Sequence, residues 1–417
     1  HDEYIDGQPV PVYVYVPIAN YDVVIKWNSG AFVQRMHGSD TTPTVEEAFR
    51  IAMPADGTYT LSLHLSQYGG AYRTIANTTV DIRAAGGALN LAGSAASETL
   101  VASAFGDILS MSLGGGVLAG GAGADRINGG GGDDVLSGDD GDDRLNGEQG
   151  ADWLYGGEGD DTLAGGDGAD ALYGGGGRDS LAGGEGDDSL YGGAGDDVLY
   201  ASAGQDHYEG GEGRDVIVFA AFATDLAIDL SDYSAYSAFI RNEIENAVGG
   251  SGDDRIRGTA YDNRLTGGAG DDTLDGSGGK DQLEGGDGAD RLVGGSDDDL
   301  LIGGAGADVF VFHASIQYAR PGLDRIVDFE AGFDTIELKQ GAFLGGMRAG
   351  ESVNFYSSPT LPAPGAMTGT AGVLIHVAGN GMLYWDQDGG AGPMAPVAFA
   401  RLTNLVPLSA SDFTVVV

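Results

Sequence analysis

The 417-residue chain has no cysteine, so it contains neither a disulfide bond nor a thiolate metal site. Basic residues are scarce: 20 Lys and Arg stand against 63 Asp and Glu, for a formal net charge of -43. Nucleic acids and anionic membrane surfaces are therefore excluded as partners, because both are bound through basic patches. No hydrophobic run approaches the length of a membrane span, so the sequence predicts no transmembrane segment.

Familiar catalytic motifs are missing as well. The sequence contains no H-E-x-x-H, which a zinc protease needs, and no G-x-S-x-G, which marks the nucleophile of lipases. The six histidines are scattered along the chain. We therefore predict that the protein is not an enzyme and has no catalytic residue. The chain starts at His1 without a signal-peptide pattern, and a first residue other than Met suggests that an upstream segment is missing or was removed.

What the sequence has in excess is glycine, with 76 residues, and most of them belong to a nine-residue repeat. From Gly120 to Val218 the chain divides without gaps into eleven units of the form G-G-x-G-x-D-x-U-x, where U is a large apolar residue. A second block of seven units runs from Gly249 to Val311. A flexible glycine linker would share this composition but would not hold the phase, so the pattern indicates a folded solenoid.

Position six of the unit is the acidic position. In the first block it is occupied by Asp125, Asp134, Asp143, Asp152, Asp161, Asp170, Asp179, Asp188, Asp197, Asp206 and Asp215. In the second block it is occupied by Asp254, Asn263, Asp272, Asp281, Asp290, Asp299 and Asp308. Position five is often a second carboxylate, such as Asp187, which we expect to point outward and to be dispensable.

The repeat predicts a glycine-rich turn followed by a very short strand, with the position-eight side chain pointing inward. Two units form one coil, and successive coils stack as parallel strands about 4.8 Å apart. Carboxylates stacked at that distance repel each other unless a cation lies between them. Calcium fits because it takes six to eight oxygen ligands and accepts backbone carbonyls, whereas zinc prefers His and Cys.

We therefore predict calcium sites made by the position-six side chains of stacked turns. Pairing each unit with the unit two further along gives about fourteen calcium ions in the two blocks. The other ligands are predicted to be backbone carbonyls of turn residues such as Gly157, Gly159, Gly166, Gly168, Gly175, Gly177, Gly184, Gly186, Gly193, Gly195, Gly268, Gly270, Gly286 and Gly288.

The repeat resembles the nonapeptide of the RTX (repeats-in-toxin) family, also described as the hemolysin-type calcium-binding repeat. The resemblance covers residues 120–218 and 249–311, and weakly 93–119. It implies a parallel β-roll that binds calcium in its turns. Asn263, with Tyr261 where glycine is expected, and Asp297 depart from the family pattern.

The C-terminal stretch, which includes DRIVDFEAGFDTIEL and LYWDQDGGAG, resembles the cap and secretion signal of RTX proteins exported by type I systems. This resemblance implies export from a Gram-negative bacterium without an N-terminal signal peptide. It also implies a further calcium site around Asp324, Asp328 and Asp334.

The predicted fold class is all-β, with an N-terminal β-sandwich, parallel β-roll blocks and a C-terminal β cap. Residues 1–88 alternate apolar and polar side chains between turn signals, which favours an immunoglobulin-like or jelly-roll-like sandwich. Residues 9–17 are either its first edge strand or a donor strand for a neighbouring molecule. TVEEAFRIAM is predicted as a strand rather than a helix. The remaining predicted segments are degenerate coils at 89–119, β-roll at 120–218, interrupting strands at 219–248, β-roll at 249–311, and the cap with secretion signal at 312–417.

Together these features favour an extracellular calcium-binding structural protein. It would fold on calcium after secretion and assemble as a homopolymer into a surface filament, layer or matrix. Two alternatives remain: a calcium-dependent adhesin, or the C-terminal part of a secreted RTX hydrolase whose catalytic domain lies elsewhere.

Overall fold

The computed structural model describes residues 101–102, 104–224, 226–230, 239–241, 244–312, 322–339, 355–361, 373–386 and 396–416, together with short strands upstream. These strands are β1 (Val10–Val16), β2 (Asp22–Val23), β3 (Met36–His37), β4 (Glu47–Met53), β5 (Tyr59–Ser62), β6 (Thr78–Asp81), β7 (Leu89–Ala92) and β8 (Glu98–Val101). Apart from a single 3-10 turn, η1 (Ala410–Asp412), every regular element in these residues is a strand, so the all-β prediction is confirmed there. None of the described residues forms a helix able to cross a membrane.

The chain divides into two compact units. The first comprises residues 1–215 with 235–243, and the second comprises residues 216–234 with 244–417.

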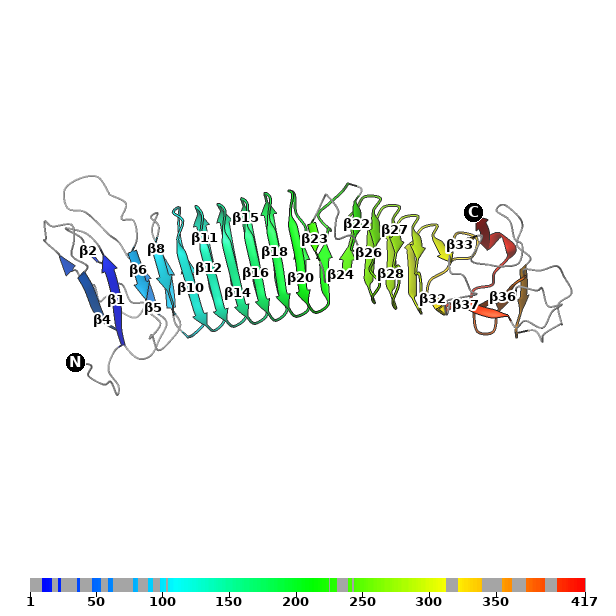
Figure 1. The fold of residues 1–417 in the computed structure, drawn as a ribbon, viewed down its shortest axis with the longest axis horizontal. Coiled ribbons are helices and arrows are strands. Elements are labelled where there is room, and N and C mark those ends of the chain that lie inside the picture. The colour runs from blue at the N-terminus through cyan, green and yellow to red at the C-terminus, as the bar shows by residue number, and fades with distance from the viewer. Residues whose placement is uncertain are drawn as a thin grey trace. The chain divides into compact units, whose positions relative to one another are not determined.

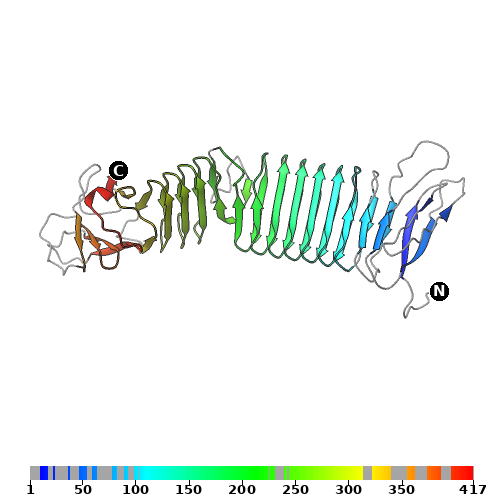
Figure 2. The same ribbon diagram turned by 180° about the vertical axis from the view of Figure 1, so that it is seen from behind.

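The first unit is built from two ladders of parallel strands, visible as successive arrows from β8 to β20 in Figure 1 and, for the opposite face, in Figure 2. One ladder contains β8, β10 (Val117–Ala122), β12 (Val135–Asp140), β14 (Trp153–Glu158), β16 (Ala171–Gly176), β18 (Ser189–Ala194), β20 (His207–Glu212) and β23 (Phe239–Arg241). The other contains β7, β9 (Ile108–Ser110), β11 (Arg126–Gly131), β13 (Arg144–Gln149), β15 (Thr162–Asp167), β17 (Ser180–Glu185) and β19 (Val198–Tyr200). Consecutive units of the repeat thus alternate between the ladders.

The register of each ladder follows from the repeat. Leu136 pairs with Leu154, and Leu154 with Leu172, so equivalent positions two units apart lie side by side. The position-eight side chains point inward and form a narrow core, in which Leu136, Leu154 and Leu172 are each 0% exposed. This confirms the predicted parallel solenoid. The position-nine tyrosines on the outer face stack as well, with Tyr173 and Tyr191 ring centroids 4.8 Å apart.

The upstream strands do not confirm a separate sandwich. β6 pairs in parallel with β8, and β5 pairs in parallel with β7, so ladder stacking is already present before residue 89. β1 is antiparallel to both β4 and β6, which places it inside a sheet with both of its edges paired within the chain. β4 is a strand, as the alternating pattern of TVEEAFRIAM predicted.

The second unit repeats the two-ladder plan. One ladder contains β22 (Ala227–Asp229), β25 (Arg255–Arg257), β27 (Thr273–Asp275), β29 (Arg291–Val293), β31 (Val309–Phe312), β33 (Thr335–Lys339) and β38 (Phe413–Val416). The other runs through β21 (Asp215–Val218), β24 (Ile244–Val248), β26 (Arg264–Ala269), β28 (Gln282–Asp287), β30 (Leu300–Ala305) and β32 (Asp324–Ile326). Strands β22, β23 and β24 lie within the predicted interruption at 219–248.

Beyond the repeats, four further strands are described: β34 (Phe355–Ser358), β35 (Val373–Val377), β36 (Met382–Asp386) and β37 (Val397–Leu402). β36 is antiparallel to both β35 and β37, and β37 pairs in parallel with β32. Val373, Ile375 and Val377 of β35 form a small hydrophobic cluster with Met382 and Tyr384. The predicted secretion signal remains a prediction.

Candidate metal centre: the turns of the β-roll

The turns of the repeat depend on glycine at positions two and four. Every glycine predicted to supply a carbonyl ligand has a positive φ, for example 123° at Gly157 and 135° at Gly159. Positive φ is costly for residues with a Cβ, which explains the glycine at these positions. Among the residues that replace these glycines, four also have positive φ, between 71° and 80°: Asp139, Glu148, Ser277 and Asp297. Asp297 therefore departs from the sequence pattern without changing the turn.

The position-six side chains form a buried ladder along each edge of the roll. Asp134, Asp152 and Asp170 are each at most 3% exposed. The Oδ1 atom of each accepts a hydrogen bond from the backbone N–H of the position-six residue one coil earlier; the Asp134 N to Asp152 Oδ1 distance is 2.7 Å. The peptide between two stacked carboxylates thus reduces their repulsion. All the predicted position-six residues lie in these ladders.

The second oxygen of most of these carboxylates is buried and has no hydrogen-bond partner among the described residues. This holds for Oδ2 of Asp125, Asp134, Asp143, Asp152, Asp161, Asp170, Asp179, Asp188, Asp197, Asp272, Asp281, Asp290 and Asp299. Buried polar atoms are normally paired, because leaving one unsatisfied costs about 1–3 kcal/mol. A recurring unsatisfied oxygen at the same position of each unit therefore indicates a ligand position.

A backbone carbonyl oxygen lies near the unpartnered Oδ2 atom, beside the position-one glycine. A Cβ built on Gly129 would lie 2.6 Å from Asp134 Oδ2 and 2.9 Å from the carbonyl oxygen of Gly147, the position-one residue of the next coil. Only glycine leaves room for both oxygens. The carbonyls predicted from the sequence lie at positions two and four, and this geometry adds the position-one carbonyl as a further candidate.

The chemistry of these oxygens fits calcium. Carboxylate and carbonyl oxygens are the ligands that hard cations such as calcium prefer. Within the described residues, no group of three or more His, Cys, Asp or Glu side chains could hold a metal. A site here must therefore combine one or two carboxylates with backbone carbonyls, which calcium accepts more readily than magnesium or zinc.

Burial also changes the acidity of the ladder. Removal from water, partly offset by the backbone N–H bond, raises the pKa of Asp143 and Asp197 to about 7 and that of Asp281 to about 8. Neighbouring carboxylates add to the increase. Near neutral pH and without a compensating cation, these buried carboxylates are thus partly protonated.

These pKa shifts predict opposite pH dependences with and without calcium. In calcium-free buffer, the folded roll binds more protons than the unfolded chain, so its stability is greatest below about pH 4 and is lost as the pH rises through about 6 to 8. With calcium present, acidification should instead destabilise the roll, because protons compete for the ligand oxygens. Thermal melts between these pH values, with and without calcium, measure both slopes. If the melting temperature changed with pH in the same direction with and without calcium, the position-six carboxylates would not be calcium ligands.

In three turns, the corresponding side-chain atom of position six makes a hydrogen bond instead. Oδ2 of Asp206 accepts hydrogen bonds from the Tyr208 and Ser202 hydroxyls. Oδ2 of Asp254 accepts one from the backbone N–H of Gly250 at 2.7 Å. The amide nitrogen of Asn263 donates to the carbonyl of Glu245 at 2.6 Å.

The ladders extend beyond the predicted position-six residues. Asp107, in the degenerate coil upstream, is 1% exposed, and its backbone N–H donates to Asp125 Oδ1. Asp107 stands at position six of the nine-residue phase, which could have identified it from the sequence. Its unit, ASAFGDILS, has lost most of the glycines that mark the repeat. Downstream, Asp324 and Asp334 accept hydrogen bonds from the backbone N–H groups of Asp299 and Asp308 at 3.1 and 2.9 Å. These last two belong to the site that the family resemblance implied.

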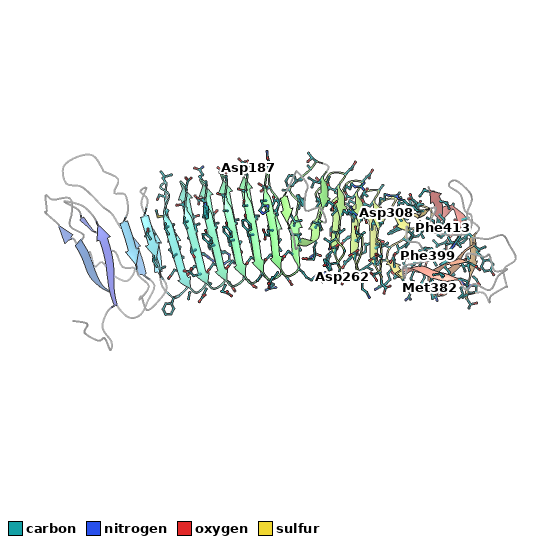
Figure 3. The ribbon with its side chains drawn as sticks, viewed as in Figure 1. Asp187, Asp262, Asp308, Met382, Phe399 and Phe413 are labelled. Carbon is teal, nitrogen blue, oxygen red and sulfur yellow. The ribbon has the colours of Figure 1, made fainter. Side chains whose placement is uncertain are left out.

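Position five forms a second ladder, at the exposed edge of the turns. Asp187, seen at the turn edge in Figure 3, accepts a hydrogen bond at 2.8 Å from the backbone N–H of Gln205, one coil further on. Asp142 does the same for Asp160 at 3.0 Å. Asp187 lies at the exposed edge, as expected, and its side chain in addition accepts a backbone hydrogen bond that the repeat pattern did not predict. Whether it is dispensable stays a prediction, which the next experiment tests.

Substitution of Asp187 by alanine is expected to destabilise the calcium-loaded roll by about 1 kcal/mol, the net contribution of one such hydrogen bond. Glu185→Ala is the matched control, because it removes the same charge from the same turn and its side chain makes no hydrogen bond with the described residues. Urea melts of both variants measure the difference. Equal midpoints would show that only the charge matters.

The turns described above lie in residues that match a known family of repeats. A family model for the RTX calcium-binding nonapeptide repeat (4 copies) matches residues 113–145, 146–181, 182–217, 248–283 and 284–313. Among solved structures, the AlgE6R3 subunit from the Azotobacter vinelandii mannuronan C5-epimerase is similar at 24% identity, covering 40% of this chain and 80% of that chain with a TM-score of 0.20. No curated protein sequence matches the chain. Residues 113–217 and 248–313, which form the β-roll, are thus RTX calcium-binding nonapeptide repeats.

Proposed function

We propose that the protein is an extracellular structural protein whose β-roll folds when calcium binds in its turns. The ligands are the position-six carboxylates of stacked coils together with turn carbonyls, including that of the position-one glycine. The observation that carries this proposal is the column of buried, unpartnered Oδ2 atoms, such as those of Asp161, Asp179 and Asp197. Nothing else among the described residues compensates them.

Calcium would supply positive charge where the chain has almost none. With about fourteen sites, the two blocks would gain roughly +28, which offsets much of the formal charge of -43. In a calcium-poor cytosol the carboxylates would repel and disfavour the folded roll. In a calcium-rich exterior the same residues would become ligands, so folding would follow export through a type I system.

Assembly into a surface filament, layer or matrix is the second part of the proposal. The calcium-set roll would act as a rigid spacer, and the N-terminal strands would provide the contact between copies. Since β1 is paired on both edges within the chain, donation of residues 9–17 to a neighbour would require β1 to leave β4 and β6.

Sedimentation velocity and negative-stain microscopy of the full chain, with calcium and with EGTA, test the assembly. We expect filaments or sheets in calcium and monomers in EGTA. A chain lacking residues 1–17 should remain a folded monomer in calcium if those residues make the contact. Monodisperse wild-type monomers at all calcium concentrations would remove the assembly part and leave calcium-dependent folding standing.

A further inference from the structure

The repeat unit at residues 201–209 departs from the pattern at three places together. Ala201 replaces the position-one glycine, Ser202 the position-two glycine, and Tyr208 the aliphatic position-eight residue. In the other seventeen units of the two blocks, position one is always glycine. The three changes converge on the same position-six side chain, Asp206.

In this unit, two side-chain hydroxyls bond to the carboxylate oxygen that has no partner in most other units. The Tyr208 hydroxyl donates to Asp206 Oδ2 at 2.7 Å, and the Ser202 hydroxyl donates to the same atom at 3.1 Å. The Tyr208 oxygen in turn accepts a bond from the Ser202 backbone N–H at 3.2 Å. Tyr208 is 1% exposed and Asp206 is 3% exposed, so the network is buried.

The preceding units provide the contrast. Oδ2 of Asp188 and of Asp197 has no hydrogen-bond partner among the described residues, and each of these units has glycine at position one. There the carboxylate oxygen lies where a Cβ would go. In the unit at 201–209, Ala201 carries the methyl group for which the other units leave no room.

The unit at 258–266 reaches the same result with different residues. The neutral Asn263 stands at position six, and its Oδ1 accepts the Thr259 backbone N–H at 2.7 Å and the Thr259 hydroxyl at 3.2 Å. Its amide nitrogen donates to the Glu245 carbonyl at 2.6 Å and to the Thr259 hydroxyl at 3.1 Å. The Asn263 side-chain N–H thus bonds to the Glu245 carbonyl oxygen, which would otherwise be available as a calcium ligand.

The backbone at position two distinguishes these units from ordinary ones. Ser277 also has a hydroxyl at position two, but its φ is 71°, and its hydroxyl lies toward Asp275 rather than toward the ladder. Oδ2 of Asp281 in that unit remains unpartnered. Neither Ser202 nor Thr259 is among the residues with positive φ, so their hydroxyls can turn back to position six.

We propose that the turns at Asp206 and Asn263 take no calcium and are held by these hydrogen-bonded side chains instead. The inference rests on the proposed calcium binding of the remaining turns. The first is the tenth of eleven units in its block and the second is the second of seven, so each lies one unit away from residues 219–248 in the sequence. Near the interruption, each block therefore contains one turn that keeps its structure without metal.

Restoring the consensus tests the proposal by a gain of binding. The triple variant Ala201→Gly, Ser202→Gly, Tyr208→Leu rebuilds the ordinary unit, and native mass spectrometry of the full chain in saturating calcium counts the ions. We expect one more calcium ion than in the wild type. Tyr208→Phe is the matched control: it removes the hydroxyl but keeps Ala201, so it should lose stability without gaining an ion.

A second restored variant tests the same proposal if the first variant does not fold. Thr259→Gly, Tyr261→Gly, Asn263→Asp restores the consensus in the other unit and should also add one ion. Equal ion counts in the wild type and in a folded restored variant would overturn the proposal. A wild type that binds no calcium would instead defeat the proposed function, so the two failures are distinguishable.

Discussion

At a pH above the raised pKa values of the buried carboxylates, removal of calcium with EGTA is expected to abolish the β-sheet circular dichroism of the repeat blocks, and readdition should restore it. The reason is the buried carboxylate ladder: without a cation, many charged or partly protonated side chains remain at most 3% exposed, with Oδ2 unpartnered in residues such as Asp143 and Asp170. Dissociation constants of roughly 10⁻⁴ to 10⁻³ M would make millimolar calcium stabilise the roll by about 1 kcal/mol per site. Summed over the sites, this is on the order of 10–15 kcal/mol, comparable with the stability of a whole domain.

The matched control for this experiment is magnesium at the same ionic strength. It screens surface charge equally well but demands octahedral geometry and keeps its waters, so it should not restore the fold. A spectrum that is unchanged by EGTA would contradict calcium-dependent folding. Recovery with magnesium would show that screening of the -43 charge, rather than site binding, drives folding.

Gly129→Ala is expected to remove one calcium site and to destabilise the roll by about 1–3 kcal/mol. The new methyl group would lie 2.6 Å from Asp134 Oδ2 and 2.9 Å from the Gly147 carbonyl oxygen, closer than a real Cβ approaches either atom. Because both oxygens are candidate ligands, their displacement should lower calcium affinity as well as stability. Calcium titrations followed by calorimetry, with urea melts in calcium, measure the two effects.

Gly131→Ala is the control two residues away in the same turn. A Cβ there would lie 3.6 Å from its nearest neighbours, in Leu113, and Gly131 does not have a positive φ. We expect calcium binding to be unchanged and stability to change by less than about 0.5 kcal/mol. If both variants lost stability equally, the loss would reflect glycine's backbone freedom rather than the ligand position.

The nine-residue phase alone predicted much of the roll. The position-eight leucines alternate between two ladders, and equivalent residues pair two units apart, as Leu136 and Leu154 do. This works because each unit is short and contacts only its neighbours, so local periodicity determines the packing. The same periodicity identified the position-six residues as a stacked row, which the structure shows as a buried ladder.

The segments outside the repeats were harder to predict, because they have no local periodicity that determines their packing. Upstream of the repeats, alternating side chains indicated strands, and β4 is one, but alternation does not specify the partner of a strand. Only the structure places β6 in parallel beside β8 and β1 between β4 and β6. Such pairings join residues far apart in sequence and depend on the completed neighbouring strands.

The roles of individual carboxylates also required the tertiary structure. Asp187 and Asp188 are adjacent and chemically identical, yet one caps an exposed backbone N–H of the next coil and the other lies buried with one oxygen unpartnered. Asp188 and Asp206 share a repeat position, yet only Asp206 meets a tyrosine hydroxyl. The sequence by itself determined that carboxylates would stack every second unit, because spacing sets their row. Which oxygens face a donor, and which remain open for a cation, depends on contacts between coils that exist only after the roll has formed.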